Sequence, residues 1–355
     1  MYHGVTSITR TSVRIVHSQP QADDTWCNVL KHIEHANLAQ LPQWYNIIQQ
    51  AYGHIPIYLE GEDNIGHHAI LPSFLIRNPV FGAVVTSMPF LDAGGPCSAS
   101  PALTQTLLAS LLGRAAEHGA RLVEVRCTAP MDLPLSPVGD KVNLCLQLPK
   151  TPELLWRQLD TKIRNQIRKA ERSALSIEVG HAEKLNDFYE PFLHNMRDLG
   201  SPVHALGFFQ TILTAFGDNA QVVLVRKGTK AIGGLIALTF KDSLIVPWAS
   251  SLRQYLPLCP NMLLYWETLR LGCLQGLRRF EFGRSSRNSG TYRFKRQWGA
   301  LEEPLYWYTI PLNSHPIKPI SITSKRATLL MSVWQHLPLN VTRWLGPKIR
   351  KYLPQ

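Results

Sequence analysis

The sequence predicts two successive domains, each built on a mixed β-sheet with helices on both faces. The chain has 355 residues, of which 45% are apolar, enough for two hydrophobic cores. Each half begins with helices, continues with alternating strands, and then crosses by a helix to a further strand. The segments GARLVEVR (119–126) and GLRRFEFGR (276–284) are alike at an offset of about 157 residues, with Glu124 matching Glu281. This repeat indicates an internal duplication.

Composition and cysteine usage exclude several classes of protein. Charged residues make up 17% of the chain and aromatic residues 9%, which excludes a disordered chain and a coiled coil. No apolar stretch approaches the ~18 residues of a membrane span, and the first residues contain no apolar signal-peptide core. The six cysteines form no CxxC pair, so we expect buried thiols in a reducing compartment. We therefore predict a soluble cytoplasmic protein.

In the first half, an extended segment at 12–18 precedes helices, strand-like runs and a crossover helix. That helix is the clearest element, because Leu103, Leu107 and Leu111 recur at helical spacing and Pro101 stands at its start. Turn signals separate the strands. The predicted helices are 24–36, 42–52 and 101–118, and the predicted strands are 54–60, 68–76, 81–87 and 121–126.

The second half repeats this order with more helices at its start. The predicted helices are 152–160, 162–173, 182–199, 205–216 and 261–275, and the strands are 142–148, 221–226, 231–240, 243–250 and 278–284. A short helix is expected near 292–298, and prolines divide the C-terminal tail into two short helices. The predicted domains are 1–140 and 141–312, followed by a basic helical tail at 313–355.

Positive charge is concentrated in the second half. Residues 1–140 carry 7 Lys/Arg and 11 Asp/Glu, whereas residues 141–355 carry 30 and 14, so the net charges are −4 and +16. The excess comes mainly from 150–172, 278–296 and the tail after Glu303, which has seven basic residues and no acidic one. Either these charges are a solvated surface, or a phosphate-rich molecule binds the second half.

The segment FEFGRSSRNSGTYRFKRQWG (280–299) has the highest density of residues suited to chemistry. A strand ends at Gly283, a polar loop follows, and aromatic residues then alternate with basic ones. A cation among buried aromatic rings stabilises a nearby negative charge more than it would in water. The loop adds donors for phosphate or carboxylate groups: Arg284, Ser285, Ser286, Arg287 and Asn288. An aromatic helix that closes a sheet edge would explain the same segment equally well.

These residues carry a family resemblance. The string FGRSSRNSGTYRFKRQWG (282–299), with NMLLYWE (261–267), resembles the FemAB/FemX family of aminoacyl transferases, and more closely its branch associated with exosortase/PEP-CTERM exopolysaccharide systems. TKIRNQIRKAERSALSIEVG (161–180) and NMRDLGSPVHALGFF (195–209) match as well. The resemblance covers roughly residues 10–310. It implies tandem domains of the GNAT acyltransferase fold, which the order of elements also resembles.

The resemblance also implies a reaction and its residues. Family members move an amino acid from aminoacyl-tRNA to an amine of a cell-wall precursor, and the lysine of a Phe-Lys pair neutralises the oxyanion. Here that pair is Phe294–Lys295, and Tyr292 is expected to form a wall of the site. We expect substrate contacts from Asn261, Tyr265, Arg284, Ser285, Arg293, Trp298 and His204. Aminolysis of an ester requires a positive group at the oxyanion, but no cofactor and no metal.

Other donors and sites have weaker support in the sequence. GNAT enzymes that use acetyl-CoA hold its pyrophosphate with a glycine-rich turn before a helix, and the corresponding residues RQYLPL (253–258) contain no glycine. Aminoacyl-tRNA is therefore favoured over acyl-CoA as the donor. The 13 histidines show no HxxxH or HExxH spacing, and no GxSxG is present. Neither a metal site nor a serine nucleophile is predicted.

Several further features allow both a structural and a functional interpretation. Arg164 and Arg168 lie one turn apart on a predicted helix and, with Lys169, form either a solvated face or a track for tRNA or another anion. His204 either packs in a loop or acts near the substrate. Asn261 either caps a helix or opens the cleft. The aromatic and basic tail docks either on its own domain or on an anionic membrane.

Together these observations predict an aminoacyl or acyl transferase. Its acceptor is expected to be an amine on an anionic envelope precursor, of peptidoglycan type or on a sugar- or lipid-linked exopolysaccharide precursor. The protein is expected in the cytoplasm or at the inner membrane face. The alternatives are an acyl-CoA-dependent N-acyltransferase and a non-catalytic basic adaptor of a polysaccharide-assembly complex. The sequence identifies neither the donor, the acceptor nor the oligomeric state.

Overall fold

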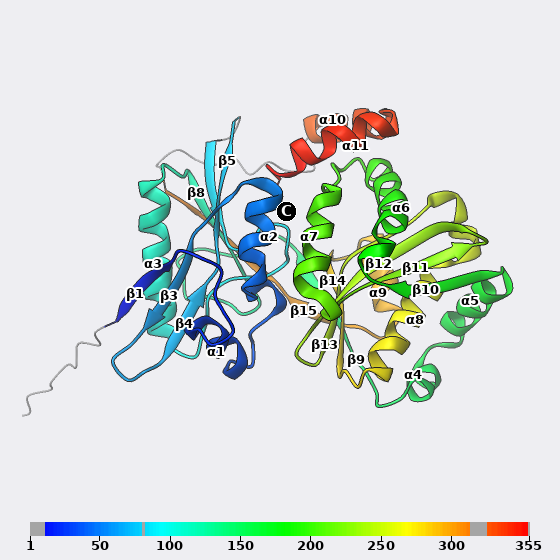
Figure 1. Cartoon of the computed structure of the whole chain (residues 1–355), viewed down its shortest axis with the longest axis horizontal. Coiled ribbons are helices and arrows are strands. Elements are labelled where there is room, and N and C mark those ends of the chain that lie inside the picture. The colour runs from blue at the N-terminus through cyan, green and yellow to red at the C-terminus, as the bar shows by residue number, and fades with distance from the viewer. Residues whose placement is uncertain (1–10, 80–81, 313–324, 354–355) are drawn as a thin grey trace, which may run out of the picture. The chain divides into compact units, whose positions relative to one another are not determined.

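The computed structural model of the chain describes residues 11–79, 82–312 and 325–353. These residues form two compact units, each with its own hydrophobic core (Figure 1). The first unit contains the described residues up to Gly139 and those from Leu305 to 312. The second unit runs from Asp140 to Pro304 and includes the described part of the tail.

The first unit contains two sheets. One has the strand order β1-β3-β4-β7 and is antiparallel throughout. The other has the order β16-β8-β6-β5-β2, with β6 and β8 parallel and the remaining pairs antiparallel. The strands are β1 (Ser12–Val16), β2 (Ile55–Pro56), β3 (Tyr58–Glu62), β4 (His68–Leu71), β5 (Phe74–Asn78), β6 (Gly82–Thr86), β7 (Cys97–Ser98), β8 (Leu122–Cys127) and β16 (Tyr306–Pro311). The helices are α1 (Thr25–His32), α2 (Gln43–Tyr52) and α3 (Pro101–Glu117).

Helix α3 forms where its leucine spacing predicts. The Ser100 hydroxyl accepts a hydrogen bond from the Leu103 amide, and Pro101 occupies the first turn, where its missing N–H costs nothing. Leu103 and Leu107 are fully buried and pack against Gly61 of β3. Helix α3 therefore covers the first sheet and carries the chain from β7 to β8, which pairs in parallel with β6.

The second unit is built on one seven-stranded sheet, with the order β10-β11-β12-β13-β14-β9-β15. Only β13 and β14 are paired in parallel among its described strands. The strands are β9 (Lys141–Gln147), β10 (Leu175–Gly180), β11 (Ala220–Lys227), β12 (Lys230–Phe240), β13 (Ser243–Ser251), β14 (Arg279–Ser286) and β15 (Leu301–Pro304). The helices before the tail are α4 (Pro152–Gln158), α5 (Thr161–Arg172), α6 (Leu185–Asp198), α7 (Leu206–Phe216), α8 (Pro260–Leu274) and α9 (Gly290–Arg296).

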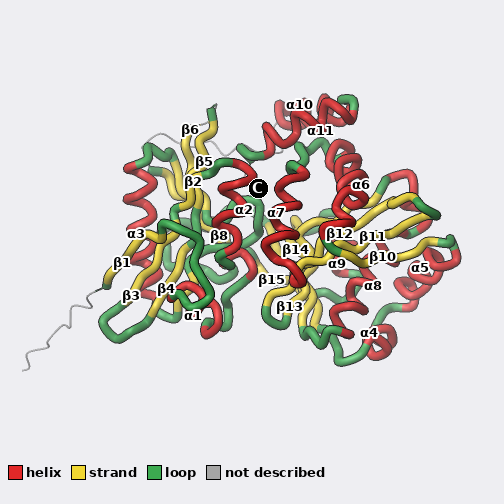
Figure 2. The backbone as a smooth tube through the Cα atoms, in the orientation of Figure 1, coloured by secondary structure: helices red, strands yellow, loops and turns green. Residues whose placement is uncertain are grey.

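Helices cover both faces of this sheet (Figure 2). A Cβ at Gly234 in β12 would contact the Phe188 ring of α6, whereas Leu235 beside it belongs to the core under α8. Because side chains alternate across a strand, α6 and α8 lie on opposite faces. Helix α8 is apolar almost all round, since α5 covers it from outside through Ile163 and Ile167.

Two predicted features of the first half differ in the structure. The run at 68–76, predicted as one strand, is divided between β4 and β5, which belong to different sheets. The division falls at Pro72 and Ser73, because a proline cannot donate to a ladder and the Ser73 carbonyl accepts from Ile57 instead, at 2.8 Å. Strand β16, which we assigned to the second domain, pairs with β8 and completes the first unit. The first unit therefore includes a strand, β16, that follows the second unit in sequence.

Candidate active site

The parallel strands β13 and β14 separate part-way along the second sheet. They are in register over three pairs, from Ser243 opposite Arg279 to Ile245 opposite Glu281. Beyond that point β13 continues beside β12, and β14 continues beside β9. No ladder pair joins these two described strands after Glu281, so the sheet opens between them. Strand edges that lack a ladder partner can bond an extended ligand.

Gly283 bends β14 at the opening. The register with β9 slips between Glu281 and Arg284, and Gly283 has a φ of 75°, in the left-handed region that favours glycine. Such a bulge turns the following side chains to a new direction. Phe282 before the bulge and Ser285 after it are both buried.

Lys295 is hydrogen-bonded to the backbone of this bulge. It lies on α9, whose first turn is capped by the Ser289 hydroxyl accepting from the Tyr292 amide at 3.1 Å. Lys295 Nζ donates to the carbonyl oxygens of Gly283 and Arg284, at 2.8 and 2.9 Å, and the residue is only 8% exposed. A positive group is thus held rigidly beside the opening, where the local dielectric is low.

An aromatic cluster joins α8, β14 and α9 in the same region. The Tyr265 ring stacks on Phe282 with centroids 5.5 Å apart and meets Phe294 edge-on at 5.2 Å. The Trp298 ring meets the Phe294 ring edge-on, with centroids 6.3 Å apart. Burial raises the pKa of Tyr265, so its hydroxyl is neutral at physiological pH. The structure therefore brings together four predicted residues, namely Lys295, Tyr265, Phe294 and Trp298.

Two buried polar atoms of this region have no hydrogen-bond partner among the described residues: Ser285 Oγ and Trp298 Nε1. Ser285 directly follows the two residues whose carbonyls bind Lys295, and Trp298 lies one turn after Lys295. A buried polar atom without a partner costs about 1–3 kcal/mol, so such atoms call for an explanation. A polar group on a bound ligand would satisfy them.

Tyr292 is tied to the neighbouring strand β15. Its hydroxyl donates to Glu302, which also accepts from Arg287 Nε at 2.9 Å. The bond to Glu302 raises the pKa of Tyr292, while Tyr292 and Arg287 lower the pKa of Glu302. Tyr292 is therefore a neutral side chain held in a fixed position, and its role in a site wall stays a prediction.

The turn before α8 uses its amides within the chain. Residues Arg253–Leu258 form a 3-10 helix, in which the Tyr255 amide donates to Leu252 at 3.0 Å. The amides of Cys259 and Met262 also bond to nearby carbonyls. A pyrophosphate-binding turn presents several such amides to its ligand. These three amides are therefore engaged within the chain, and the preference for a donor other than CoA stays a prediction.

Asn261 does not cap α8, contrary to the simplest prediction. The helix begins at Pro260, and its N-cap is Cys259, with a φ of 60°. The Asn261 side chain instead accepts a hydrogen bond from the Ser251 hydroxyl at the end of β13. Asn261 therefore links the start of α8 to the end of β13, and its predicted place at a cleft stays a prediction.

The two predicted arginines of the loop region differ in exposure. Arg284 is half-buried on β14, and its carbonyl is one of the two that bind Lys295. Arg293 is exposed on α9 and donates to the Asn288 carbonyl at 2.8 Å. Arg293 therefore holds the loop between β14 and α9, and the predicted substrate contacts of both arginines stay predictions.

The predicted basic track lies on α5. Arg168 and Lys169 are exposed, and the Arg168 guanidinium lies 5.5 Å from the centre of the Trp156 ring. Arg164 is half-buried, and its Nε has no hydrogen-bond partner among the described residues. The predicted basic face is therefore only partly exposed: Arg168 and Lys169 are open to solvent, whereas Arg164 is half-buried.

His204 does not join the opening. Its side chain is 1% exposed, stacks on Phe208 at 4.6 Å, and accepts from Arg350 Nε of the tail at 3.1 Å. Burial, and to a lesser degree Arg350, lowers its pKa well below the usual range. His204 therefore acts as a neutral acceptor that holds the tail, and our prediction of a substrate contact is not supported by its position.

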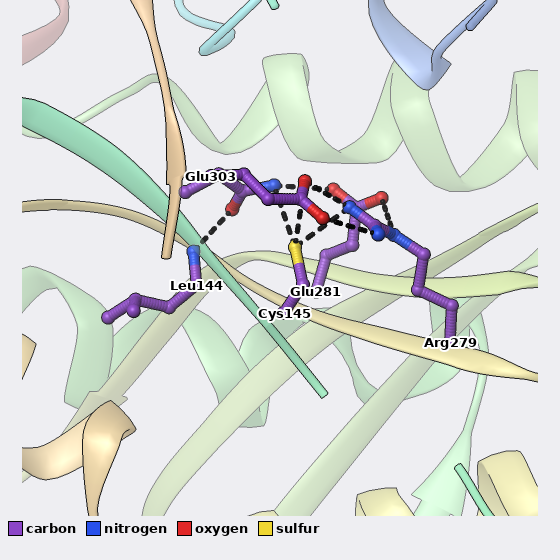
Figure 3. A network of polar contacts seen from close by, with 6 residues as sticks. Leu144, Cys145, Arg279, Glu281 and Glu303 are labelled. Carbon is purple, nitrogen blue, oxygen red and sulfur yellow. Dashed lines mark hydrogen bonds and ion pairs between the residues drawn. The ribbon is translucent and has the colours of Figure 1, made fainter. Parts of the chain in front are cut away.

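A charged network on β14 was not predicted from the sequence (Figure 3). Arg279 donates to Glu281 at 3.0 Å and to Glu303 of β15 at 2.6 Å, and Cys145 of β9 contacts both Arg279 and Glu303. Burial raises the pKa of Cys145; burial also opposes ionisation of Glu303, but Arg279 keeps the pKa of that carboxyl below its usual value. The network braces three adjacent strands. The alternation of charged and aromatic residues in RRFEFGR was the signal that could have revealed it.

A cavity of about 750 Å³ lies elsewhere in the second unit, beside α6. Its lining carries both signs of charge, but Asp187 pairs with Arg226, Glu190 with Arg343 and Asp198 with Arg197. These ion pairs leave it little net attraction for a charged ligand. Within the described ranges, no three His, Cys, Asp or Glu side chains are placed to hold a metal ion. None of the described helices is both long and apolar enough to cross a membrane.

Comparisons with known proteins address the fold. Residues 157–296 match the family described as "Acetyltransferase (GNAT) domain". This range contains β13, α8, β14 and Lys295. The search of curated protein sequences gives no match. Among solved structures, FemX is similar at a TM-score of 0.63 and 12% identity, covering 80% of this chain and 94% of FemX.

Two further solved structures span most of both chains. L-PGS from Bacillus licheniformis is similar at a TM-score of 0.54 and 11% identity, covering 93% of this chain and 98% of that one. A tandem GNAT protein from the clavulanic acid biosynthesis pathway is similar at 0.53 and 10%, covering 86% and 100%. At such identities the likeness concerns the fold. The predicted fold class is confirmed: this chain has a mixed α/β, tandem GNAT-like fold.

Proposed function

We propose that the second unit is an aminoacyl or acyl transferase and that the reaction takes place at the opening between β13 and β14. The observation that carries this proposal is Lys295, a buried positive side chain bonded to Gly283 and Arg284 where the two strands separate. The GNAT domain match over 157–296 supports the reaction class.

In the proposed reaction, a neutral amine of the acceptor attacks the ester carbonyl carbon of the donor. A C–N bond forms, negative charge develops on the carbonyl oxygen, and the C–O bond to the donor then breaks. Lys295 Nζ stabilises that oxygen, and the proton lost by the amine ends on the leaving oxygen. Ser285 Oγ and Trp298 Nε1, which lack partners in the described structure, supply further donors to the bound groups.

Aminoacyl-tRNA is the donor that we favour. The amides of Tyr255 and Cys259 before α8, and of Met262 in its first turn, are engaged within the chain, which disfavours these groups as ligands of a CoA pyrophosphate. The exposed Arg168 and Lys169 and the +16 charge of residues 141–355 suit a polyanion. The proposed enzyme needs no cofactor of its own.

The acceptor that we favour is an amine on an anionic envelope precursor, in peptidoglycan or exopolysaccharide assembly. Two considerations support it: the motif resemblance to FemAB/FemX proteins, and the fold likeness to FemX over 80% of the chain. An excess of basic side chains also suits a phosphate-linked sugar or lipid carrier. We place the protein in the cytoplasm or at the inner membrane face, where such precursors are made.

An acyl-CoA-dependent N-acyltransferase is the second candidate. It is favoured by the match to the family described as "Acetyltransferase (GNAT) domain" over residues 157–296. The two candidates differ in donor chemistry, an oxygen ester against a thioester, and share the same oxyanion. An experiment that varies the donor therefore distinguishes the two candidates, whereas a variant of Lys295 does not.

A donor comparison tests the proposal. The purified chain is incubated with aminoacyl-tRNA or acyl-CoA and an amine-bearing acceptor, and the amide product is followed by mass spectrometry. Native mass spectrometry of the same preparation shows whether tRNA, CoA or a nucleotide-sugar co-purifies. We expect amide formation from aminoacyl-tRNA. Product from acyl-CoA alone would establish the second candidate, and no product from either donor would leave only the adaptor.

A further inference from the structure

The C-terminal helix α11 (Leu339–Arg350) is attached to the second unit by one face. Thr342 and Gly346 are buried there, and a Cβ at Gly346 would lie only 2.8 Å from Val203 Cγ1. Arg343 pairs with Glu190 of α6. Together with the bond from Arg350 to His204, these contacts fix α11 to the unit.

Helix α10 (Lys325–His336) packs on α6 in the same way. Trp334 is buried, and Gln335 donates to the Asp198 carbonyl at the end of α6, at 3.0 Å. Gly200, just after α6, lies so close to α10 that a Cβ there would be 2.9 Å from the Met331 carbonyl oxygen. The structure therefore confirms that the tail docks on its own domain, as one of our two interpretations proposed.

The opposite sides of both helices carry large apolar side chains that are exposed. On α10 these are Leu329, Leu330 and Val333, which are 66%, 69% and 54% exposed and lie within one helical arc. On α11 they are Val341 and Trp344, one turn apart, with Trp344 64% exposed. All nine tryptophans lie in the described ranges, and the other eight are buried or half-buried. We call these five residues the tail face.

Basic side chains accompany the tail face. Lys348 Nζ lies 3.6 Å from the centre of the Trp344 ring, and Lys351 Nζ lies 4.7 Å from that of Tyr352. The sequence after Glu303 contains seven Lys/Arg and no Asp or Glu. Tryptophan and tyrosine beside lysine are the side chains that a membrane–water interface favours.

We propose that the tail face binds the surface of an anionic lipid bilayer. Its leucines and Trp344 enter the headgroup region, and Lys348 and Lys351 lie at the lipid phosphates. A second copy of the chain fits less well, because a symmetric contact would bring the lysines of two acid-free tails together. This inference goes beyond the transferase proposal and does not depend on it.

Co-sedimentation of the full chain with lipid vesicles tests the inference. We expect binding to phosphatidylcholine vesicles that contain phosphatidylglycerol, much weaker binding to pure phosphatidylcholine, and a decline at high salt. Leu330→Ser/Trp344→Ser should lower the partition coefficient about tenfold or more, because both side chains lose apolar burial. Lys348→Gln/Lys351→Gln should lower it by about fivefold per lysine.

Matched controls come from exposed leucines of the same unit outside the tail. Leu274→Ser/Leu301→Ser changes residues that are 61% and 65% exposed, and partition should be unchanged. If Leu274→Ser/Leu301→Ser lowered the partition coefficient as much as Leu330→Ser/Trp344→Ser does, the tail face would not be the binding surface. The same conclusion would follow from a wild type that sediments as a dimer and becomes a monomer in Leu330→Ser/Trp344→Ser without binding vesicles. Amide formation with a soluble acceptor should be the same in all these variants, which separates this inference from the proposed function.

Discussion

Both units contain a strand–helix–strand crossover, β6-α3-β8 in the first and β13-α8-β14 in the second, and each parallel ladder ends on a glutamate. The last pairs are Thr86 with Glu124 and Ile245 with Glu281. These are the two glutamates that the weak internal similarity aligns. The common position supports an internal duplication, and it allows the two crossovers to be compared residue by residue.

The first crossover is closed by an arginine. Arg126 is fully buried, its Nε donates to Glu124 at 2.8 Å, and an Nη donates to the Leu91 carbonyl at 2.8 Å. The guanidinium also lies 4.2 Å from the centre of the Trp307 ring. The polar groups at the end of this ladder are therefore satisfied within the unit.

The second crossover is left open at the same point. Gly283 bends β14 away from β13, Lys295 bonds the carbonyls at the bend, and Ser285 Oγ and Trp298 Nε1 lack partners in the described part of the chain. The same supersecondary unit is therefore closed where its own side chains satisfy the polar groups at the end of the ladder, and is left open where they do not.

Removing the arginine that closes the first crossover should have the largest effect. Arg126→Met leaves Glu124 largely buried without its cation, so we expect the free energy of unfolding to fall by about 3–5 kcal/mol. Chemical denaturation monitored by fluorescence measures this. Arg126→Lys, which keeps a charge, should recover part of the loss. A change in Arg126→Met no larger than that of a surface ion pair, about 1 kcal/mol, would show that the closure is not structural.

Removing the lysine of the second crossover should affect turnover instead. Lys295→Met should lower the rate of amide formation by about 10²–10³, the usual result of losing one oxyanion donor. Circular dichroism and thermal unfolding establish whether the variant is folded. The matched control is Lys227→Met, which changes an exposed lysine of the same sheet and should leave the rate unchanged. Near-normal turnover of Lys295→Met would place the chemistry elsewhere.

The charge difference between the units predicts where a polyanion binds. Arg168→Gln/Lys169→Gln should weaken tRNA binding and reduce the slope of log affinity against log salt by about one or two. Stability should change by ~1 kcal/mol or less, because both side chains are exposed. Arg77→Gln/Arg114→Gln, in the acidic first half, is the control that should leave the slope unchanged. If the two double variants behave alike in filter binding, the +16 charge is only solvated surface.

The smallest predicted effect is a pH dependence of stability. Burial depresses the pKa of His204 in the folded state below its unfolded value of 6.5, so the unfolded chain binds more protons near and below that pH. The stability associated with neutral His204 is therefore complete above pH 6.5 and is lost as the pH falls toward the folded pKa. Melting temperatures measured across this range should fall less in His204→Gln than in wild type. Parallel curves for the two proteins would contradict the assignment.

Local patterns were enough to predict much of the secondary structure. Helix α3 follows from its leucine spacing and Pro101, and the strand at 278–284 follows from its alternation and corresponds to β14. The order of such elements was enough to predict two units of one fold. Each of these predictions depends on residues that are close together in sequence, where intrinsic backbone preferences and side-chain periodicity act directly.

Pairing between distant segments could not be predicted in the same way. Strands β10, β15 and β16 were not predicted, and β16 lies in the first unit although it follows the second in sequence. Asn261 was expected either as a cap or at the cleft, and the cap is Cys259, whose positive φ lets the helix begin at Pro260. These outcomes depend on which strand edges and side chains meet after folding, which no local pattern specifies.

The charge imbalance, the aromatic and basic composition of residues 280–299, and the repeated order of elements follow from the amino-acid sequence alone. Which of these residues lie together depends on the folded structure. It fastened Lys295 to the Gly283 bulge, left Ser285 and Trp298 without partners in the described structure, and buried His204 against the tail. The physical reason is that burial and hydrogen-bond satisfaction are properties of a packed neighbourhood, and the neighbours of these side chains come from segments far apart along the chain.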